Sequence, residues 1–471
     1  MISILINCLF FINLVLILYL VFKNNLSTEQ TWAWVLVLLF MPIVGIILYV
    51  FFGRGLSRKK IYTTKIPSEV NQYLSRQEQN LSEHQLDLNI QMPKIDELVH
   101  LLLQSDEGIL TNNNQVQLII DGIDKFEHVM DDIDQAQKHI HFEYFCFEAD
   151  RIGHNILNHL VAAAKRGVKV KVLLDGWGSL ATKKSFFKPL IDLGGEVSFF
   201  MPYLTQANYR NHRKIIVIDG YIGYLGGFNI GDTYLGLNPK MGYWRDNHLK
   251  VIGDAVKILQ LRFLLDWNAE NKHHEPYLSD YFPDIVTGGQ TKMQVISSGP
   301  DTEREHIKRV YLKMINLAED EILIQTPYYI PDDAIQEAIK LALLSGVKVR
   351  IQIPDKPDHI FVYWATYSYV SELLEYGATI EIYQNGFMHA KTLIIDGQIA
   401  SVGSANFDIR SLHLNFEINS VIYDKEFTQY LRQTFLQTST QCLQLTKEQY
   451  QNRGIIIKIK EGFAKLIAPI L

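Results

Sequence analysis

Two stretches of the chain, RNHRKIIVIDG at residues 210–220 and MHAKTLIIDG at residues 388–397, decide the fold. They share the pattern His-x-Lys, four further residues, then Asp: His212, Lys214 and Asp219 in the first, His389, Lys391 and Asp396 in the second. Residues two apart on a β-strand point to the same face, so the histidine and the lysine of each stretch lie together while the apolar residues continue into a core. Each aspartate stands before a glycine, at a turn, which indicates that it holds the loop.

The sequence around each stretch is also duplicated. AAAKRGVKVKVLLDG around Gly167 matches LALLSGVKVRIQIPD around Gly346, and the next histidine follows 45 and 43 residues later. GGFN at residues 226–229 matches GSAN at residues 403–406. A repeat of this length indicates two copies of one structural unit.

Short apolar runs alternate with longer amphipathic stretches in both copies, which predicts α/β architecture with a mainly parallel sheet. We expect two tandem α/β/α sandwich halves, residues 111–270 and 293–471, joined by a polar linker at 271–292 and packed about a pseudo-twofold axis.

The N-terminal region predicts a membrane anchor. Residues 2–22 carry no charge and, as a helix, would extend about 30 Å, the thickness of a bilayer core. Residues 31–52 repeat that apolar pattern after a polar bridge, and four basic residues follow at 54–60. We therefore expect residues 1–60 to form a transmembrane helical hairpin in the cell membrane, with the remaining chain on the cytoplasmic side. A cleaved signal peptide fits less well, because the apolar region is long and has no clear cleavage site.

Two further segments are less distinctive. Residues 61–110 are polar with scattered apolar positions, and we interpret them as a linker with helical pieces. The C-terminal GIIIKIKEGFAKLIAPIL mixes apolar residues with lysines. It could lie as an amphipathic segment at a membrane interface, or pack as a terminal strand and helix.

If the two halves meet at their axis, their histidines and lysines can share one pocket with the amides of Asn229 and Asn406. Such a pocket fits a phosphodiester: lysines and amides bind the phosphate oxygens, one histidine attacks phosphorus, and the other protonates the leaving oxygen. Each histidine also needs an acceptor for its other ring nitrogen. Asp246 and Glu417, 34 and 28 residues after His212 and His389, are the candidates, each expected to face the histidine of its own half.

Other chemistries have weaker support. The net charge of −6 gives no general attraction to nucleic acid, and no nucleotide-binding GxxxxGK[ST] loop is present. KHHEP at residues 272–276 is the nearest candidate for a metal site, but it falls in a polar linker. We expect no catalytic metal, no cofactor and no nucleic-acid partner. Three arginines near the first motif, Arg210, Arg213 and Arg245, could bind a headgroup phosphate or simply serve solubility.

These motifs resemble the phospholipase D superfamily, which is defined by twin HKD motifs. Together with the N-terminal spans, the segments WRDNH, TPYYIPDD, GSANFDIRS and LNFE are similar to membrane-anchored bacterial cardiolipin synthases along nearly the whole chain. The resemblance implies transfer of a phosphatidyl group from one phosphatidylglycerol to another, giving cardiolipin and glycerol through a phosphatidyl-histidine. It also implies that His212, Lys214, Asn229, His389, Lys391 and Asn406 form the catalytic and phosphate-binding set, with Asp219 and Asp396 as structural members. Family precedent favours His212 as the nucleophile and His389 as the acid and then the base, but the sequence leaves the choice between the two histidines open.

Three other activities would use the same histidines or the same anchor. A hydrolytic phospholipase D would resolve the intermediate with water, and a phosphatidylserine synthase would use another donor and acceptor. A lipid-binding scaffold without activity should have lost a motif histidine or lysine, and both motifs are intact. The sequence leaves the oligomeric state and the acyl-chain preference open.

Overall fold

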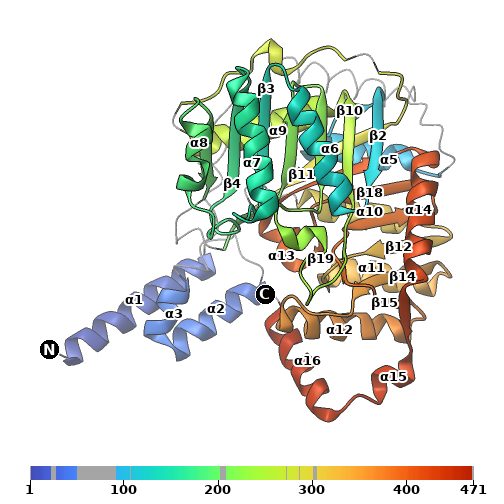
Figure 1. Ribbon diagram of the computed structural model, residues 1–471. Helices are drawn as coiled ribbons and strands as arrows, with labels where there is room; N and C mark the ends of the chain where they lie inside the picture. Colours follow the sequence, from blue (N-terminus) through green and yellow to red (C-terminus); the bar gives the residue numbers. More distant parts are fainter. Residues whose placement is uncertain are drawn as a thin grey trace.

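The computed structural model describes residues 2–22, 28–49, 92–106, 108–201, 208–271, 273–285, 287–300 and 305–468. A group of N-terminal helices lies beside a large α/β body in which two sheets are stacked (Figure 1). The expected basic flank at residues 54–60 and most of the expected linker lie outside the described residues.

The first half of the body is built on a seven-stranded sheet in the order β2-β10-β8-β7-β3-β4-β5. These strands are β2 (Asn114–Ile119), β3 (His139–Tyr144), β4 (Lys169–Asp175), β5 (Glu196–Phe200), β7 (Lys214–Ile218), β8 (Ile222–Gly226) and β10 (His248–Gly253). Its helices are α6 (Gly122–Gln135), α7 (Arg151–Lys165), α8 (Lys188–Ile191) and α9 (Ala255–Glu270).

The second half repeats this order as β11-β20-β18-β17-β12-β14-β15, with β1 (Leu110–Thr111) and β21 (Cys442–Leu445) added at the two edges. The repeated strands are β11 (Met293–Ser298), β12 (Glu321–Gln325), β14 (Lys348–Pro354), β15 (Thr379–Tyr383), β17 (Thr392–Ile395), β18 (Ile399–Gly403) and β20 (Asn415–Ile422). The helices are α5 (Ile95–Asp106), α10 (His306–Leu317), α11 (Asp333–Leu344), α12 (Ile360–Glu375), α13 (Ile409–His413), α14 (Lys425–Ser439), α15 (Lys447–Gln451) and α16 (Ile455–Ile467). The expected duplication of an α/β fold is confirmed by this repeated topology.

The expectation of a mainly parallel sheet is wrong. Only β3-β4-β5 and β12-β14-β15 run parallel, and the remaining neighbours in the repeated order pair antiparallel. The reason is that each motif strand turns back at once: β7 pairs with β8, and β17 with β18, across a tight turn that contains the motif aspartate. A turn this short can join only antiparallel strands.

Both faces of each motif strand are buried, against different partners. In β7, Ile216 and Ile218 belong to the core shared with α6 and α7, whereas Ile215 and Val217 face the other half. The core between the two sheets contains residues from both halves, among them Leu249, Val251, Ile394 and Val402. Burial on both faces fixes the register of the strand, because a slip by one residue would exchange the two faces.

Asp219 and Asp396 hold the far ends of the motif strands, five residues beyond the lysines. Both adopt left-handed backbone, with φ of 55° and 52°. Their carboxylates accept hydrogen bonds from three successive backbone amides at the start of the neighbouring strand, residues 137–139 and 319–321. They therefore lie roughly 17 Å along the strand from the lysines and stabilise the turn.

Part of the expected linker is structural core. α5, within residues 61–110, buries Leu98, Val99 and Leu102 in the core of the second half. Gln294 on β11 donates to the backbone oxygen of Val99. α5 thus precedes the first half in the sequence but packs in the second half. No repeat in the sequence indicates this arrangement.

The N-terminal helices are α1 (Ile2–Phe22), α2 (Thr28–Phe40) and α3 (Pro42–Leu48). The expected second span is therefore divided at Met41, because proline disfavours helical backbone at the residue before it. Trp34 and Tyr49 pack edge to face, and Leu20 of α1 joins Leu38 of α2 in a small core. Within the described residues, no helix meets the length and hydropathy needed to cross a bilayer.

Candidate active site

Two short parallel ladders cross between the halves and build the site. β6 (Arg210–Asn211), directly before the first motif, pairs with the beginning of β20. β16 (Phe387–Met388), directly before the second motif, pairs with β9 (Trp244–Arg245). The ladders continue by one hydrogen bond each, from the His212 amide to Phe416 and from the His389 amide to Arg245. Each histidine is thereby held beside a strand of the opposite half.

This pairing places each histidine against the carboxylate of the other half. His212 Nδ1 lies 3.0 Å from both carboxylate oxygens of Glu417, and His389 Nδ1 lies 2.5 Å from Asp246 Oδ2. The expectation that each carboxylate faces the histidine of its own half is wrong. Each histidine directly follows a short strand that pairs with the opposite half. The register of that pairing places the histidine beside the carboxylate of the opposite half.

The two rings are arranged alike. Among the described residues, the side-chain hydrogen bonds of both histidines go through Nδ1, which leaves each Nε2 available to a substrate. An ionised carboxylate on Nδ1 selects the tautomer with its proton there, so Nε2 carries a lone pair that can attack.

Burial and charge keep these groups in that state. Burial lowers the pKa of both histidines, and with repulsion from Lys391 it brings the pKa of His389 to about 4. Burial by itself would raise the pKa of Glu417, but His212 and Lys214 overcome it and hold that pKa below its ordinary value. Burial would likewise raise the pKa of Asp246, but Lys391 and His389 hold that pKa below its ordinary value. Neutral imidazole beside ionised carboxylate is the expected resting state.

The motif lysines lie behind the histidines. Lys214 Nζ donates to the backbone oxygen of His212 at 2.6 Å, and Lys391 Nζ donates to that of His389. Both side chains are fully buried. Burial lowers the pKa of Lys214 to about 7 and that of Lys391 to about 8. Two cations beneath the histidines can neutralise the oxygens of a bound phosphodiester.

The asparagines and their neighbours differ between the halves. Asn229 donates to Tyr234 Oη at 3.0 Å, and Asn406 donates to Asp408 while its own oxygen has no partner among the described residues. Ser404 Oγ donates to Glu417 at 2.5 Å. The equivalent residue in the first half is Gly227, where a Cβ would lie 2.0 Å from Asp246 Oδ1. The glycine is therefore required for the close approach of Asp246.

The arginines near the first motif have separate positions. Arg210 is half-buried above the Trp177 ring. Arg245 is buried and donates to Asn247. Arg213 is fully buried and pairs with Asp266 at 2.8 Å, with further hydrogen bonds to the backbone oxygens of Glu417 and Ser298. The interpretation of Arg213 as a headgroup ligand or a solubilising surface residue is thus wrong, because it joins the two halves inside the protein.

Replacing Asp266 with alanine should destabilise the fold by about 3 kcal/mol, because it leaves the buried Arg213 charge uncompensated. Glu143, whose pKa burial raises well above its ordinary value, lies close enough to ionise and offset part of the loss. Chemical unfolding of the full chain measures the change.

The matched control for this prediction is Asp192→Ala, which removes the exposed ion pair with Lys188 and should change the stability by less than about 1 kcal/mol. Equal effects of the Asp266 and Asp192 substitutions would contradict the importance of the buried pair.

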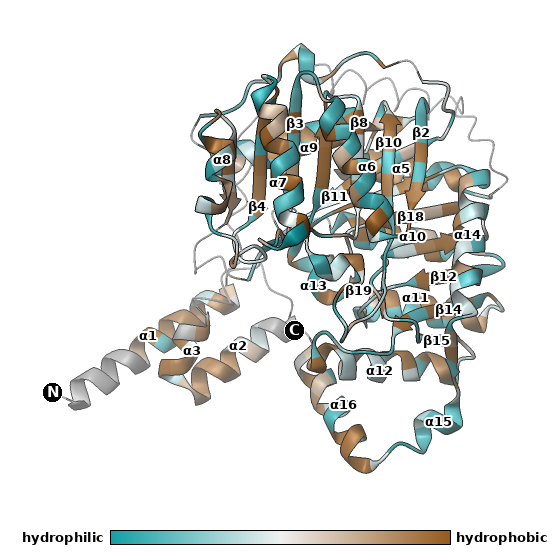
Figure 2. Cartoon of the chain, viewed as in Figure 1, coloured by the Kyte–Doolittle hydropathy of each residue, from teal (hydrophilic) through white to brown (hydrophobic). Residues whose placement is uncertain are grey.

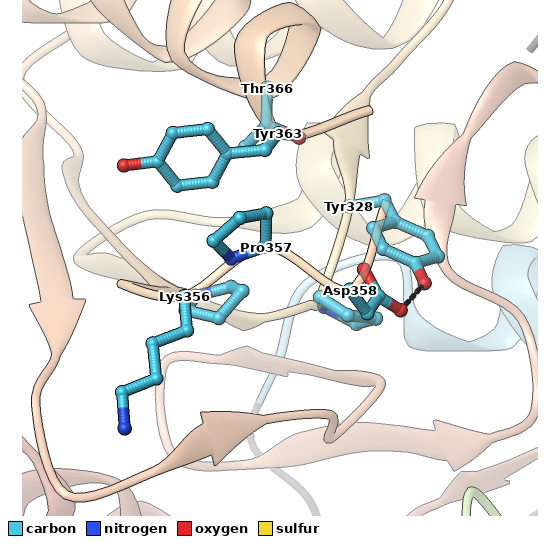
Figure 3. Close-up of a pocket in the computed structure, with 8 residues that line it drawn as sticks. Tyr328, Lys356, Pro357, Asp358, Tyr363 and Thr366 are labelled. Atoms are coloured by element: carbon cyan, nitrogen blue, oxygen red, sulfur yellow. Dashed lines mark hydrogen bonds between the residues drawn. The ribbon is translucent and has the colours of Figure 1, made fainter. Parts of the chain in front are cut away.

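A pocket lies at the edge of the second sheet where the second motif begins, between the loop after β12 and the beginning of α12. Pro327, Tyr328, Pro354, Lys356, Pro357, Asp358, Tyr363 and Thr366 line it. Figure 3 shows the Tyr328 hydroxyl directed at Asp358, to which it donates a hydrogen bond. Burial lowers the pKa of Lys391, and Asp358 is one of the carboxylates whose charge partly opposes that shift.

The described residues contain no group of three or more His, Cys, Asp or Glu side chains placed to hold a metal ion. Of the KHHEP segment, residue 272 lies outside the described residues, while Glu275 pairs with Lys171 and accepts from Tyr281. The expected absence of a catalytic metal and of a cofactor stays a prediction.

Comparison with known families gives two matches. The family described as "Cardiolipin synthase, PLD-like domain" matches residues 129–266 and 311–439, one segment in each half. The family described as "Phospholipase_D-nuclease N-terminal" matches residues 11–54.

Individual relatives match over the full length. The major cardiolipin synthase of Bacillus subtilis is 45% identical, covering 100% of this chain and 99% of its own. The cardiolipin synthase of Oceanobacillus iheyensis is 47% identical with the same coverage, and that of Listeria monocytogenes is 48% identical over 96% of this chain and 95% of its own. Among solved structures, phosphatidylserine synthase of Haemophilus influenzae shares the fold, with a TM-score of 0.63 at 16% identity over 80% of this chain and 100% of its own.

Proposed function

This chain belongs to the cardiolipin synthase family of the phospholipase D superfamily, and from that membership we propose that its crossed histidine pair joins two phosphatidylglycerol molecules into cardiolipin. The protein is a phosphatidyltransferase. The observation that carries the proposed mechanism is the pair of buried histidines, each with an ionised carboxylate on Nδ1 and a lysine behind it.

In the first step, His212 Nε2 attacks the phosphorus of one phosphatidylglycerol. The bond between phosphorus and the glycerol oxygen of the headgroup breaks, and that oxygen takes a proton from Nε2 of His389. Free glycerol leaves, and a phosphatidyl group remains on His212. His389 takes up this proton from solvent when the anionic phosphate binds, because a negative charge nearby raises the pKa of an imidazole.

In the second step, the headgroup hydroxyl of another phosphatidylglycerol attacks the phosphorus. His389 takes the hydroxyl proton while the bond between phosphorus and His212 breaks, which gives cardiolipin and restores the site. Lys214, Lys391 and the amides of Asn229 and Asn406 are proposed to bind the phosphate oxygens through both steps. No metal or cofactor takes part in this scheme.

The proposed substrates place the catalytic body at a membrane. The family match at residues 11–54 and the apolar sequence of α1 support an anchor of two spans in the cell membrane. The four basic residues at 54–60 favour a cytoplasmic position for the catalytic body. An anchored enzyme needs to draw a two-chain lipid only partly out of the bilayer.

The experiment that tests this function uses purified full-length protein and labelled phosphatidylglycerol as the only phospholipid. Cardiolipin and free glycerol in equal amounts, measured by mass spectrometry, are the expected products. Phosphatidic acid as the only lipid product would show that water resolves the intermediate, and the protein would then act as a hydrolase.

The buried lysines predict an unusual pH profile. Because the pKa values of Lys214 and Lys391 are about 7 and about 8, both are charged at low pH and lose their protons as the pH rises through that range. Since kcat/KM follows the ionisation of the free enzyme, it should begin to fall above about pH 7, as Lys214 loses its proton, and fall more steeply above about pH 8, both well below the ordinary lysine range.

Lys391→Arg provides the control for this profile, because a guanidinium keeps its charge when buried. This variant should be less active overall, since the fork of arginine cannot reproduce the lysine contact. Its alkaline decline should lose the steeper part above about pH 8, while the part that begins near pH 7 with Lys214 remains. A wild-type profile that stays flat to pH 10 would contradict the assignment.

A further inference from the structure

The C-terminal helix α16 presents its most apolar side away from the protein. Six large apolar side chains are exposed on it: Ile455, Ile456, Ile457, Ile459, Phe463 and Leu466. Ile459 is 64% exposed and Phe463 is 56% exposed. Residues at spacings of four and three lie along one face of a helix, so 455, 459, 463 and 466 form a continuous stripe. Figure 2 shows the hydrophobic residues of α16 at the lower edge of the molecule.

The side of α16 that faces the protein is small and polar. Ala464 and Ala468 pack with Ile330 and Ala365 in a minor core. Glu461 is buried on the same side, where it pairs with Arg453 and accepts from Tyr450. A surface helix of a soluble domain normally turns its apolar stripe to the core. This helix is inverted, which indicates that the outward stripe has an apolar partner.

The charge around the stripe is positive. Lys458, Lys460 and Lys465 are the charged side chains of α16 besides the buried Glu461. Lys460 lies above the Trp364 ring and Lys465 pairs with Glu372, so both stems run along the border of the stripe. Lysines bordering an exposed apolar face are typical of helices that lie in the headgroup layer of an anionic bilayer.

The stripe continues toward the active site through α12. Ile360 and Phe361, in the first turn of α12, are 51% and 43% exposed. Phe361 packs edge to face on Trp364, which in turn lies beneath Lys460. α12 begins six residues after the end of β14, at the edge of the sheet where the second motif begins, and Tyr363 of this helix lines the pocket in Figure 3.

We propose that the outward stripe of α16, with Ile360 and Phe361, is a membrane-docking surface that inserts into the headgroup layer of an anionic bilayer. The choice of a lipid surface rests on the proposed function, since the substrate and the product are both anionic lipids. Together with the N-terminal helices, which lie toward the same lower side of the body in Figure 1, this surface gives the catalytic body a second attachment. Two attachments fix the orientation of the body, so that the edge bearing the histidines faces the lipids.

The test uses the full-length protein in lipid nanodiscs that contain a photoreactive phosphatidylcholine, with its diazirine high in the acyl chain. Phosphatidylcholine reports contact with the bilayer independently of activity, so a failure of the proposed reaction would not affect this readout. After illumination, peptides carrying lipid are identified by mass spectrometry. In discs with added phosphatidylglycerol, the α16 peptide should be labelled, and Ile459→Glu with Phe463→Glu should reduce its labelling about tenfold or more.

The matched control introduces glutamate at Leu341 and Leu344, which are 60% and 70% exposed. Both lie in the last turn of α11, at the opposite edge of the sheet. This variant should leave the labelling of α16 unchanged. Thermal unfolding of both variants verifies that the fold is intact. Lys458→Gln should reduce the labelling of α16 about fivefold in discs with phosphatidylglycerol and have little effect in discs without it.

Three results would overturn the proposal. The first is an α16 peptide without lipid in the wild-type protein. The second is the same loss of labelling in the α11 variant. The third is protection of the stripe by a second copy of the chain, which mass measurements of the loaded discs and protein crosslinks through α16 would reveal.

Discussion

Replacing either His212 or His389 with alanine is expected to abolish cardiolipin formation, a loss on the order of 10⁴-fold or more in kcat. In the proposed mechanism, His212 supplies the atom that carries the phosphatidyl group, and without His389 no proton reaches the departing glycerol oxygen. The two losses should be similar in size because both steps use both rings. Product formation from labelled phosphatidylglycerol measures them.

The control is another histidine with a carboxylate partner. His159 on α7 bonds Asp134 at 2.7 Å at the protein surface, far from the motif stretches in sequence. His159→Ala should keep nearly wild-type activity. All three variants should express and fold alike, as judged by thermal unfolding. Near-wild-type turnover in His212→Ala or His389→Ala would exclude the mechanism of two histidines.

The intermediate separates the roles of the two rings. Rapid quenching of the wild-type enzyme with phosphatidylglycerol, followed by mass analysis of peptides, should find a phosphatidyl group on the peptide containing His212. An adduct on His389 would exchange the two roles and leave the rest of the scheme unchanged.

Much of the fold was predictable because the chain contains its evidence twice. The matched spacing from Gly167 to His212 and from Gly346 to His389 predicts two equivalent units, and the strand order of the two sheets repeats accordingly. The role of Asp219 was also predictable, because an aspartate before a glycine is typical of a turn, and its carboxylate indeed bonds three backbone amides.

The contacts between the halves were not predictable. The ladders that set them are only two residues long, β6 on β20 and β16 on β9, and segments this short show no periodicity. Distance along the chain favoured pairing of each histidine with the carboxylate of its own half. The register of the strands across the interface instead places each histidine beside the carboxylate of the other half. The burial of Arg213 was not predictable for a related reason, because its partner Asp266 lies on α9, 53 residues further along the chain.

The repeat has Ser404 in GSAN where it has Gly227 in GGFN, a difference that is visible in the sequence. Its physical reason is visible only in the structure. Ser404 donates to Glu417, whereas the backbone of Gly227 makes room for Asp246. The two half-sites are therefore similar in topology and different in detail. Such a difference is consistent with two rings that perform different tasks in one reaction.

Replacing Glu417 with glutamine should reduce turnover on the order of 10²- to 10⁴-fold while preserving the fold. Glu417 is fully buried and accepts hydrogen bonds from His212 Nδ1 and Ser404. A glutamine can present its amide nitrogen to Nδ1, which favours the tautomer with the proton on Nε2. The nitrogen that should attack phosphorus would then carry a proton.

The crossed arrangement makes this prediction specific. If Glu417 serves His212, Glu417→Gln should prevent formation of the phosphatidyl-histidine in a quenched first turnover. Asp246→Asn, which affects His389, should instead slow both proton transfers and still allow some adduct to form on His212. Pairing within each half requires the opposite pattern, with the adduct lost in Asp246→Asn. Asp134→Asn, at the exposed pair with His159, should leave the adduct and the turnover unchanged. An unchanged rate in Glu417→Gln would remove this carboxylate from the mechanism, and the ladder between β6 and β20 would then serve only to join the halves.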